Sequence, residues 1–205
     1  MSAAELLRGI RVVPVVVIDD ADKAVTLANT LLDAGLRAIE VTLRTPAGLD
    51  AIRNIAAEVP DMIVGAGSVR HVAQVDDIVS AGARFGVCPG SSPALLDAVD
   101  EAGLPFIRGA ITPSETLALL ERGYSLQKLF PAELSGGVQY LKGIAAPIPE
   151  AQFMPTGGIT VENAPAYLAL DTVACIGGTW IAPANALAAS DFDAISGLAR
   201  AAAAL

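Results

Sequence analysis

Short apolar runs alternate with longer amphipathic stretches along the whole chain. The apolar runs are six or seven residues long, which is typical of strands that are buried on both faces of a parallel sheet. They lie at 12–18, 38–43, 62–67, 84–90, 105–110, 126–132, 152–158 and 173–179. The pattern therefore predicts eight strands.

The stretches between these runs have the spacing of helices. They predict helices at 21–34, 46–58, 71–81, 93–102, 113–122, 161–170 and 191–204. Three of the predicted helices begin with a hydroxyl residue that is followed by proline, which is a common start of a helix: Thr45-Pro46, Ser92-Pro93 and Thr112-Pro113. Thr112 and Glu115 also have the spacing of a capping box. Glycines are expected to close four of the helices, at Gly35, Gly82, Gly103 and Gly123.

Eight strand–helix units in 205 residues predict an α/β fold of the (β/α)8, or TIM-barrel, class. No linker or low-complexity segment divides the chain, so residues 1–205 are expected to form a single compact barrel domain. An open doubly wound sheet is the structural alternative. In a barrel the active site lies at the carboxyl ends of the strands, so polar residues at those ends are the candidates for function.

Composition narrows the classes of partner. Apolar residues make up 53% of the chain and charged residues 17%, yet no apolar run approaches the ~18 residues needed to span a bilayer. The longest early run contains Pro14, and the early Glu5 does not fit a secretory signal, so we expect a cytoplasmic protein without a membrane partner. The net charge of −9 argues against a nucleic-acid partner.

The sequence offers few ligands for a metal ion. The single histidine, His71, follows a predicted strand and is expected at the surface, so no site built on several imidazoles is available. Cys88 and Cys175 stand alone in apolar runs without CxxC spacing, and we interpret them as reduced core thiols. No metal or other cofactor is therefore expected.

The second predicted strand carries an unusual set of polar residues. Side chains alternate between the two faces of a strand, so Glu40, Thr42 and Arg44 share one face. The outer face of a barrel packs under helices, so this set is expected to point into the barrel. The alternative is that it forms only a structural ion pair near the barrel mouth.

Lys128 lies in the sixth apolar run and is one of only three lysines in the chain. By the same alternation it shares a face with Leu126 and Phe130. An apolar barrel disfavours the ammonium form and so increases the fraction of free amine, which can attack a carbonyl carbon. The alternative is a silent ion pair between Lys128 and Glu40.

Glycine pairs follow the last two predicted strands, in "PTGGI" (155–159) and "CIGGTW" (175–180). In this fold the loops after strands seven and eight form a recurrent phosphate site, in which glycines let backbone N–H groups approach the phosphate and a helix N-terminus adds a favourable dipole. Thr179 can donate a hydroxyl there. Ser68, in "GAGSV" (65–69) after the third strand, offers a further hydroxyl or backbone donor.

Six motifs taken together resemble one enzyme family. They are "IEVTLRT" (39–45), "GAGSV" (65–69), "CPG" (88–90), "KLFPAE" (128–133), "PTGGI" (155–159) and "CIGGTW" (175–180). In this order and spacing they resemble the 2-keto-3-deoxy-6-phosphogluconate (KDPG) and 4-hydroxy-2-oxoglutarate (KHG) aldolases. The resemblance implies a class I, Schiff-base aldolase with a (β/α)8 fold, a homotrimer that acts on a phosphorylated 2-keto-3-deoxy acid and releases pyruvate.

The resemblance also implies a role for each matching residue. Lys128 would form the imine and Glu40 would transfer protons. Arg44 and the Ser68 hydroxyl would hold the carboxylate of the pyruvyl group, and Thr156 would lie near the reacting hydroxyl end. The residues expected to bind the phosphate are Gly157, Gly158, Gly178 and Thr179.

Departures from the family pattern at three places affect the substrate more than the chemistry. Ser68 stands where the family often has threonine, and Thr179 stands where it often has serine, so the hydroxyl is kept at both positions. Some members carry an arginine in the first strand, where this chain has Val15, Val16 and Val17. The phosphate would then have fewer cationic partners.

Three alternatives to KDPG cleavage remain open from the sequence. The first keeps the chemistry and changes the substrate to the 6-phosphogalactonate epimer or to unphosphorylated KHG. The second is a phosphate-binding barrel isomerase or transferase, similar to a thiamine-phosphate synthase. The third is a non-catalytic sugar-phosphate binding module. The last two leave Lys128 without a chemical role.

Overall fold

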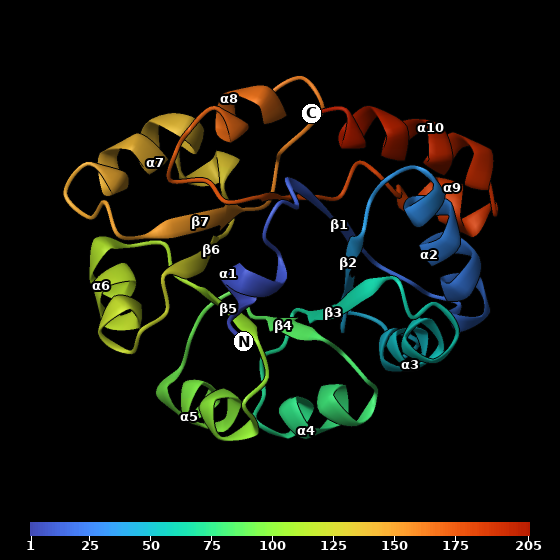
Figure 1. The fold of residues 1–205 in the computed structure, drawn as a ribbon, viewed down its shortest axis with the longest axis horizontal. Helices are drawn as coiled ribbons and strands as arrows, with labels where there is room; N and C mark the ends of the chain where they lie inside the picture. Colours follow the sequence, from blue (N-terminus) through green and yellow to red (C-terminus); the bar gives the residue numbers. More distant parts are fainter.

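The computed structural model describes all residues from 1 to 205 and contains eight parallel strands arranged as a nearly closed barrel (Figure 1). The strands are β1 (Val12–Val16), β2 (Ala38–Thr42), β3 (Ile63–Gly67), β4 (Phe85–Val87), β5 (Phe106–Gly109), β6 (Leu126–Leu129), β7 (Gln152–Pro155) and β8 (Ile176–Gly178). Neighbours along the chain pair with each other, and β8 pairs with β1. Between β7 and β8 the sheet is held by two isolated bridges, Phe153 with Val173 and Thr156 with Gly177. The predicted (β/α)8 class and all eight strands are confirmed.

Helices surround the barrel. They are α1 (Ala3–Leu6), α2 (Ala24–Asp33), α3 (Gly48–Glu58), α4 (Ala73–Ser80), α5 (Pro93–Ala102), α6 (Pro113–Glu121), α7 (Gly137–Ala145), α8 (Ala164–Leu168), α9 (Ala184–Ala188) and α10 (Phe192–Ala203), with the short 3-10 helices η1 (Ala21–Lys23) and η2 (Glu133–Ser135). None of them combines the length and the hydrophobicity that crossing a bilayer requires. Helices α1, α7 and α9 were not predicted from the sequence.

Two of the three expected helix caps are confirmed. The Ser92 hydroxyl accepts a hydrogen bond from the Leu95 N–H, and Thr112 and Glu115 form a reciprocal capping box. The expected cap at Thr45 is wrong, because α3 begins only at Gly48 and the Thr45 hydroxyl donates to the carbonyl of Ile18 instead. The four glycines expected to close helices all adopt the left-handed conformation that favours glycine.

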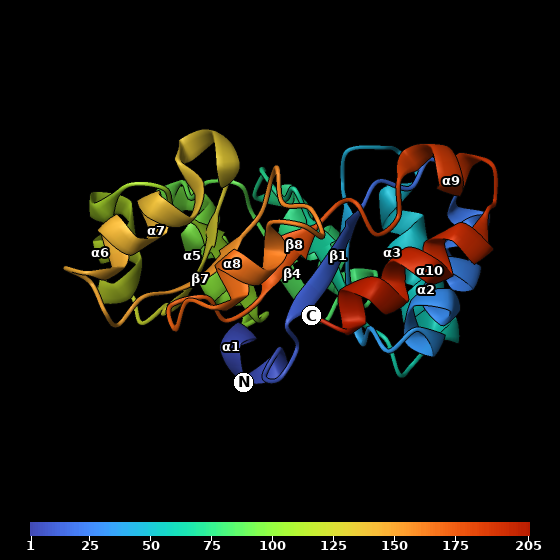
Figure 2. The ribbon, with the colours of Figure 1, turned by 90° about the horizontal axis from the view of Figure 1, so that it is seen from above.

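Apolar residues form an inner and an outer core. The outer core lies between the strands and the surrounding helices and includes alternate strand residues such as Ile39, Val41 and Leu129. The inner core fills the barrel with side chains from different strands, among them Phe85 and Ile107. Helix α1 packs Leu6 and Leu7 against this inner core and covers one end of the barrel (Figures 1 and 2). Helix α9 follows the carboxyl end of β8 and lies at the opposite end of the barrel (Figure 2). The carboxyl ends of the strands therefore lie away from α1, and this is the end at which the site is expected.

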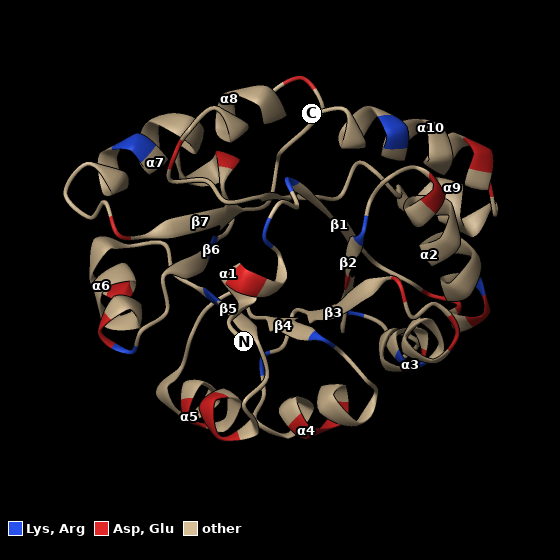
Figure 3. Ribbon diagram, viewed as in Figure 1, with Lys and Arg blue, Asp and Glu red and all other residues tan.

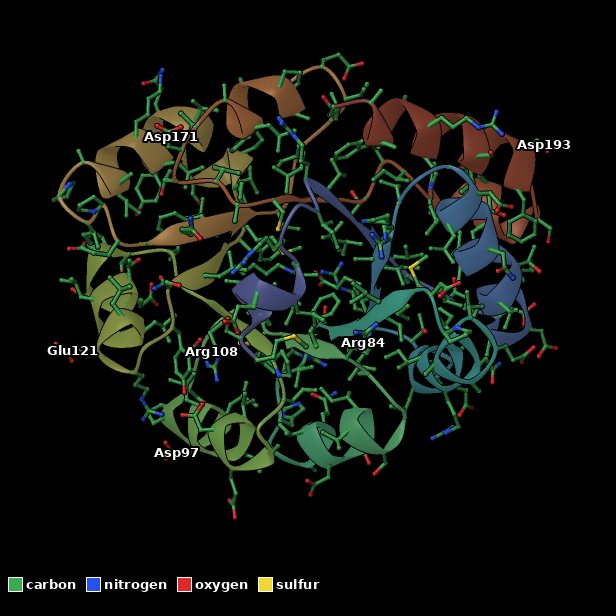
Figure 4. All side chains as sticks on the ribbon, in the orientation of Figure 1. Arg84, Asp97, Arg108, Glu121, Asp171 and Asp193 are labelled. Atoms are coloured by element: carbon green, nitrogen blue, oxygen red, sulfur yellow. The ribbon has the colours of Figure 1, made fainter.

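Acidic residues lie mainly on the outer helices (Figure 3). Asp97, Glu121, Asp171 and Asp193 all lie at the rim of the molecule (Figure 4). The net charge of −9 is therefore carried mostly at a distance from the barrel interior.

One buried cation lies between the barrel and its outer helices. Arg108 on β5 is only 5% exposed, and it points to the layer between the sheet and α5 (Figure 4). Its Nη2 donates to Asp100 Oδ1 at 2.7 Å, and its guanidinium carbon lies 3.3 Å from the centre of the Tyr124 ring. The Tyr124 hydroxyl donates to the same carboxylate, and burial together with this hydrogen bond raises the pKa of Tyr124. This cluster joins α5 to the turn before β6, and we interpret it as structural.

Candidate active site

Lys128 and Glu40 meet inside the barrel, although 88 positions separate them along the chain. Lys128 Nζ lies 3.0 Å from Glu40 Oε1 and 3.4 Å from Oε2. The lysine is 4% exposed and the glutamate 0%. The predicted inward orientation of both side chains is confirmed. Each group thus has an oppositely charged partner within hydrogen-bond distance, which offsets the cost of burying it.

Gly67 on β3 leaves the space that Glu40 occupies. A Cβ atom at this position would lie 2.1 Å from Glu40 Oε1 and 2.6 Å from Glu40 Cγ, which is closer than atoms approach one another. Glycine at residue 67 is therefore required by the position of the carboxylate beside Lys128.

Gly67→Ala should lower kcat by about 10²-fold, because a displacement of roughly 1 Å in a reacting group has an effect of this size. Its overpacking should also lower the free energy of unfolding by about 1–3 kcal/mol. Steady-state kinetics and thermal melting measure the two effects. Gly143→Ala on α7 is the control, since a Cβ there meets no atom within 4 Å. Wild-type kcat in Gly67→Ala would show that Glu40 need not lie where the structure has it.

The two cysteines are free and buried, which confirms their interpretation as core thiols. Burial, reinforced by the negative charge of Glu40, raises the pKa of Cys175 to about 12. Burial also raises the pKa of Cys88. Both thiols therefore stay protonated at neutral pH and do not compete with Lys128 as nucleophiles. His71 is exposed, as expected.

Arg44 and Ser68 come together just beyond the ends of β2 and β3. Arg44 Nε donates to Ser68 Oγ at 3.0 Å, while the two Nη nitrogens make no hydrogen bond within the chain. Ser68 has a φ of 59°, a left-handed conformation that is uncommon for serine and can mark a functional site. The guanidinium is exposed, so its outer edge is available to a carboxylate. The third member of the polar set, Thr42, is buried and donates to the carbonyl of Val16.

Glycine is needed in the two glycine pairs for different physical reasons. Gly157 and Gly158 have φ values of 98° and 79°, so their backbone conformation favours glycine. Gly177 and Gly178 have no positive φ, but a Cβ at Gly177 would lie 2.3 Å from Thr156 Oγ1 and one at Gly178 would lie 2.2 Å from the Trp180 ring. The first pair therefore shapes a loop, whereas the second pair makes room for side chains.

The remaining expected phosphate and substrate residues lie around these loops. Thr179 is exposed after β8. Thr156 is 3% exposed at the end of β7, and its bridge to Gly177 brings the two loops side by side. The helices that follow the two glycine pairs begin several residues later, α8 at Ala164 and α9 at Ala184. The loops themselves offer backbone N–H groups and the Thr179 hydroxyl as donors.

Comparison with known proteins now identifies the family. A family model described as KDPG and KHG aldolase matches residues 3–198 of this chain. The chain belongs to the KDPG and KHG aldolase family.

Members of the KDPG and KHG aldolase family are similar to this chain over nearly its whole length. A 2-dehydro-3-deoxy-phosphogluconate aldolase from Dickeya dadantii is 46% identical over 97% of this chain and 93% of the relative. A KHG/KDPG aldolase from Escherichia coli strain K12 is 47% identical, with the same coverage. The crystal structure of a KDPG aldolase from Legionella pneumophila, with pyruvate captured as a covalent carbinolamine intermediate, has a TM-score of 0.95 and 38% identity, with 98% of each chain covered.

The residues of this aldolase that shape the site without reacting were not identified as such from the sequence. Gly67 entered only as part of the GAGSV motif and Gly177 only as a member of a glycine pair, although each one leaves space for a polar side chain of the site. The glycine doublet alone carries no information about which neighbour needs the room.

Proposed function

We propose that this chain is a class I aldolase that cleaves KDPG to pyruvate and glyceraldehyde 3-phosphate through an imine on Lys128. The observation that carries the proposal is the Lys128–Glu40 pair, a nucleophile and a base at 3.0 Å inside the barrel. The name of the Escherichia coli relative supports an additional activity on KHG. A barrel isomerase or transferase would not require this pair.

Imine formation begins with the ion pair. Glu40 takes a proton from the Lys128 ammonium, and the free amine attacks the C2 ketone of the substrate. The resulting carbinolamine loses its hydroxyl, which leaves as water with the proton that Glu40 holds. This step gives a positively charged iminium that draws electrons from C3 and restores the Glu40 carboxylate.

Bond cleavage uses the same carboxylate. Glu40, directly or through a water molecule, removes the proton of the C4 hydroxyl, and the C3–C4 bond breaks to release the aldehyde. The electron pair of this bond is left in a neutral enamine of pyruvate. Glu40 then returns its proton to C3, and water hydrolyses the iminium to pyruvate and the Lys128 ammonium.

Binding at the two ends of the substrate would fix its orientation. The free edge of Arg44, with Ser68 beside it, suits the carboxylate next to C2. Thr156 would lie near the C4 hydroxyl end. We assign the phosphate to the N–H groups around Gly157, Gly158 and Gly178 and to the hydroxyl of Thr179. No cationic side chain of β1 is available to it, since residues 15–17 are valines.

The proposed chemistry is tested by trapping the imine. The protein is incubated with pyruvate, reduced with borohydride and digested, and the added mass is located by peptide mapping. We expect the adduct on Lys128. The other two lysines are internal controls, because Lys23 Nζ already donates to the carbonyls of Leu187 and Ala188 and Lys142 lies on α7. An adduct on either of them, or none at all, would overturn the assignment.

The substrate and the assembly need separate measurements. Parallel cleavage assays with KDPG, its galactonate epimer and KHG rank the three substrates, and a preference for the epimer would replace KDPG in the proposal. We further propose a homotrimer, which the resemblance to the family implies, and a cytoplasmic location, as expected from the sequence. Light scattering coupled to gel filtration tests the trimer, and a monomer mass would reject it.

A further inference from the structure

The loop after β7, residues 156–160, is held through three successive carbonyl groups. The carbonyl of Thr156 accepts from the Ala132 N–H at 2.9 Å, and that of Gly157 accepts from the Glu133 N–H at 3.1 Å. The carbonyl of Gly158 accepts from Asn163 Nδ2 at 3.2 Å. Three fixed carbonyls fix the peptide planes between them, and so they fix the directions of the intervening N–H groups.

The N–H groups of the same loop are free. Those of Gly157, Gly158 and Ile159 donate to no acceptor within the chain. Successive backbone N–H groups in a turn form a concave site for an anion. The loop therefore has its acceptors occupied and its donors unoccupied, which is the arrangement that an anion requires.

Asn163 holds the far end of the loop from two sides. Its Oδ1 accepts from the Thr160 N–H at 2.8 Å, while its Nδ2 donates to Gly158. Its own N–H lies 3.4 Å from the Thr160 hydroxyl. One half-buried side chain therefore fixes both the orientation of the Gly158 carbonyl and the backbone at Thr160, where the loop ends.

Glu133 supports the loop from the side of β6. Its Cβ and Cγ atoms lie so close to Gly158 that a Cβ there would be 2.6 Å and 2.8 Å from them. Its carboxylate accepts from the hydroxyl of Tyr167, a fully buried residue of α8. Burial and this carboxylate raise the pKa of Tyr167, so the hydroxyl stays protonated and keeps donating. This hydrogen bond fixes the position of the Glu133 carboxylate. The negative charge of the carboxylate would repel a phosphate if the side chain turned toward the free N–H groups.

We propose that Asn163, Glu133 and Tyr167 are positioning residues that hold the free N–H groups of Gly157 and Gly158 toward the phosphate and so favour a phosphorylated aldehyde over its unphosphorylated counterpart. The proposal rests on the proposed function and assigns a role to residues that do not touch the reacting atoms. It explains how a site without an arginine on β1 can hold a phosphate.

The test uses the synthetic direction, with pyruvate and either glyceraldehyde 3-phosphate or glyceraldehyde, because the two aldehydes differ only in the phosphate. Asn163→Ala and Tyr167→Phe should each raise KM for glyceraldehyde 3-phosphate by about tenfold, the effect of one lost hydrogen bond. With glyceraldehyde, kcat/KM should stay within about twofold of wild type, because this aldehyde has no phosphate that the loop could bind. The pyruvate adduct on Lys128 should form normally in both variants.

Three further variants separate positioning from general loosening. Asn54→Ala and Tyr140→Phe each remove a comparable hydrogen bond that involves no residue of the loop, to the carbonyls of Ala21 and Ile111, and should leave the ratio of kcat/KM values for the two aldehydes unchanged. Glu133→Gln keeps an acceptor for Tyr167 and removes the charge, so its KM for the phosphorylated aldehyde should equal or fall below that of wild type.

Each contrary result has a distinct meaning. Equal losses with both aldehydes, or an unchanged ratio in Asn163→Ala and Tyr167→Phe, would overturn the positioning role while the Lys128 adduct leaves the aldolase assignment intact. A loss in Glu133→Gln as large as that in Tyr167→Phe would remove Glu133 from the set. Absence of a pyruvate adduct in wild type would overturn the proposed function itself.

Discussion

Replacing Lys128 with methionine should lower kcat for KDPG cleavage by about 10⁴-fold or more, because removing the nucleophile of a covalent mechanism has effects of this order. Borohydride reduction in the presence of pyruvate should then leave the chain unlabelled. The methylene stem of lysine is replaced by a side chain of similar length, so the barrel interior stays filled. Steady-state cleavage and intact mass measure the two outcomes.

The stability of Lys128→Met needs its own control. Removing the cation leaves Glu40 buried without a partner, which lowers the free energy of unfolding by about 3–5 kcal/mol unless the carboxylate becomes protonated. Lys128→Arg keeps a positive charge beside Glu40, but guanidinium does not deprotonate and cannot form the imine. The arginine variant should therefore be folded and inactive. Activity within tenfold of wild type in either variant would show that Lys128 is not the nucleophile.

Strand parity predicted the centre of the site because it needs no information beyond the order of residues. Glu40 and Lys128 lie on strands whose neighbouring residues are apolar, and each one shares its face with residues that fill the barrel, such as Ala38 and Leu126. The alternation of faces therefore placed both charged groups in one enclosed space. The sequence could not give the 3.0 Å distance between them, which depends on the closure of the whole barrel.

Arg108 shows the limit of arguing from a buried charge alone. It also lies in a short apolar strand and is nearly as buried as Lys128, yet it faces the outer layer and pairs with Asp100 on α5. Burial of a cation in a strand therefore does not by itself indicate chemistry. The face on which the cation lies, and the presence of a base on the facing strand, distinguish the two residues.

The loops were less predictable than the strands. Glycine at residues 157 and 177 looks the same in the sequence, but the first adopts a left-handed backbone and the second makes room for Thr156. Helices α8 and α9 begin several residues after their glycines, and the glycine pairs alone did not indicate this spacing. Bonds such as that from Asn163 to Gly158 depend on loop conformation, and no periodicity specifies it.

Glu40→Gln should lower kcat for cleavage by about 10²- to 10⁴-fold, the usual contribution of a general acid–base group. Glutamine has nearly the same shape and can still accept a hydrogen bond from Lys128, but it cannot carry a proton between C4, C3 and water. The variant should form the pyruvate imine more slowly, with water carrying the protons that Glu40 moves in the wild type, and borohydride should still label Lys128 after prolonged incubation. Full cleavage activity in this variant would remove the proton-transfer role from Glu40.

A second reaction shows which proton Glu40 moves. Wild-type protein incubated with pyruvate in deuterium oxide should exchange the methyl hydrogens of pyruvate, because the enamine forms and is protonated again at C3 without any aldehyde. In Glu40→Gln this exchange, followed by proton NMR, should slow by about the same factor as cleavage, since one carboxylate serves both steps. Normal exchange together with slow cleavage would restrict Glu40 to the C4 hydroxyl and would require another acid at C3. Because Cys175 and Cys88 are protonated core thiols and no other ionisable side chain pairs with Lys128, the structure favours the common slowing of both reactions.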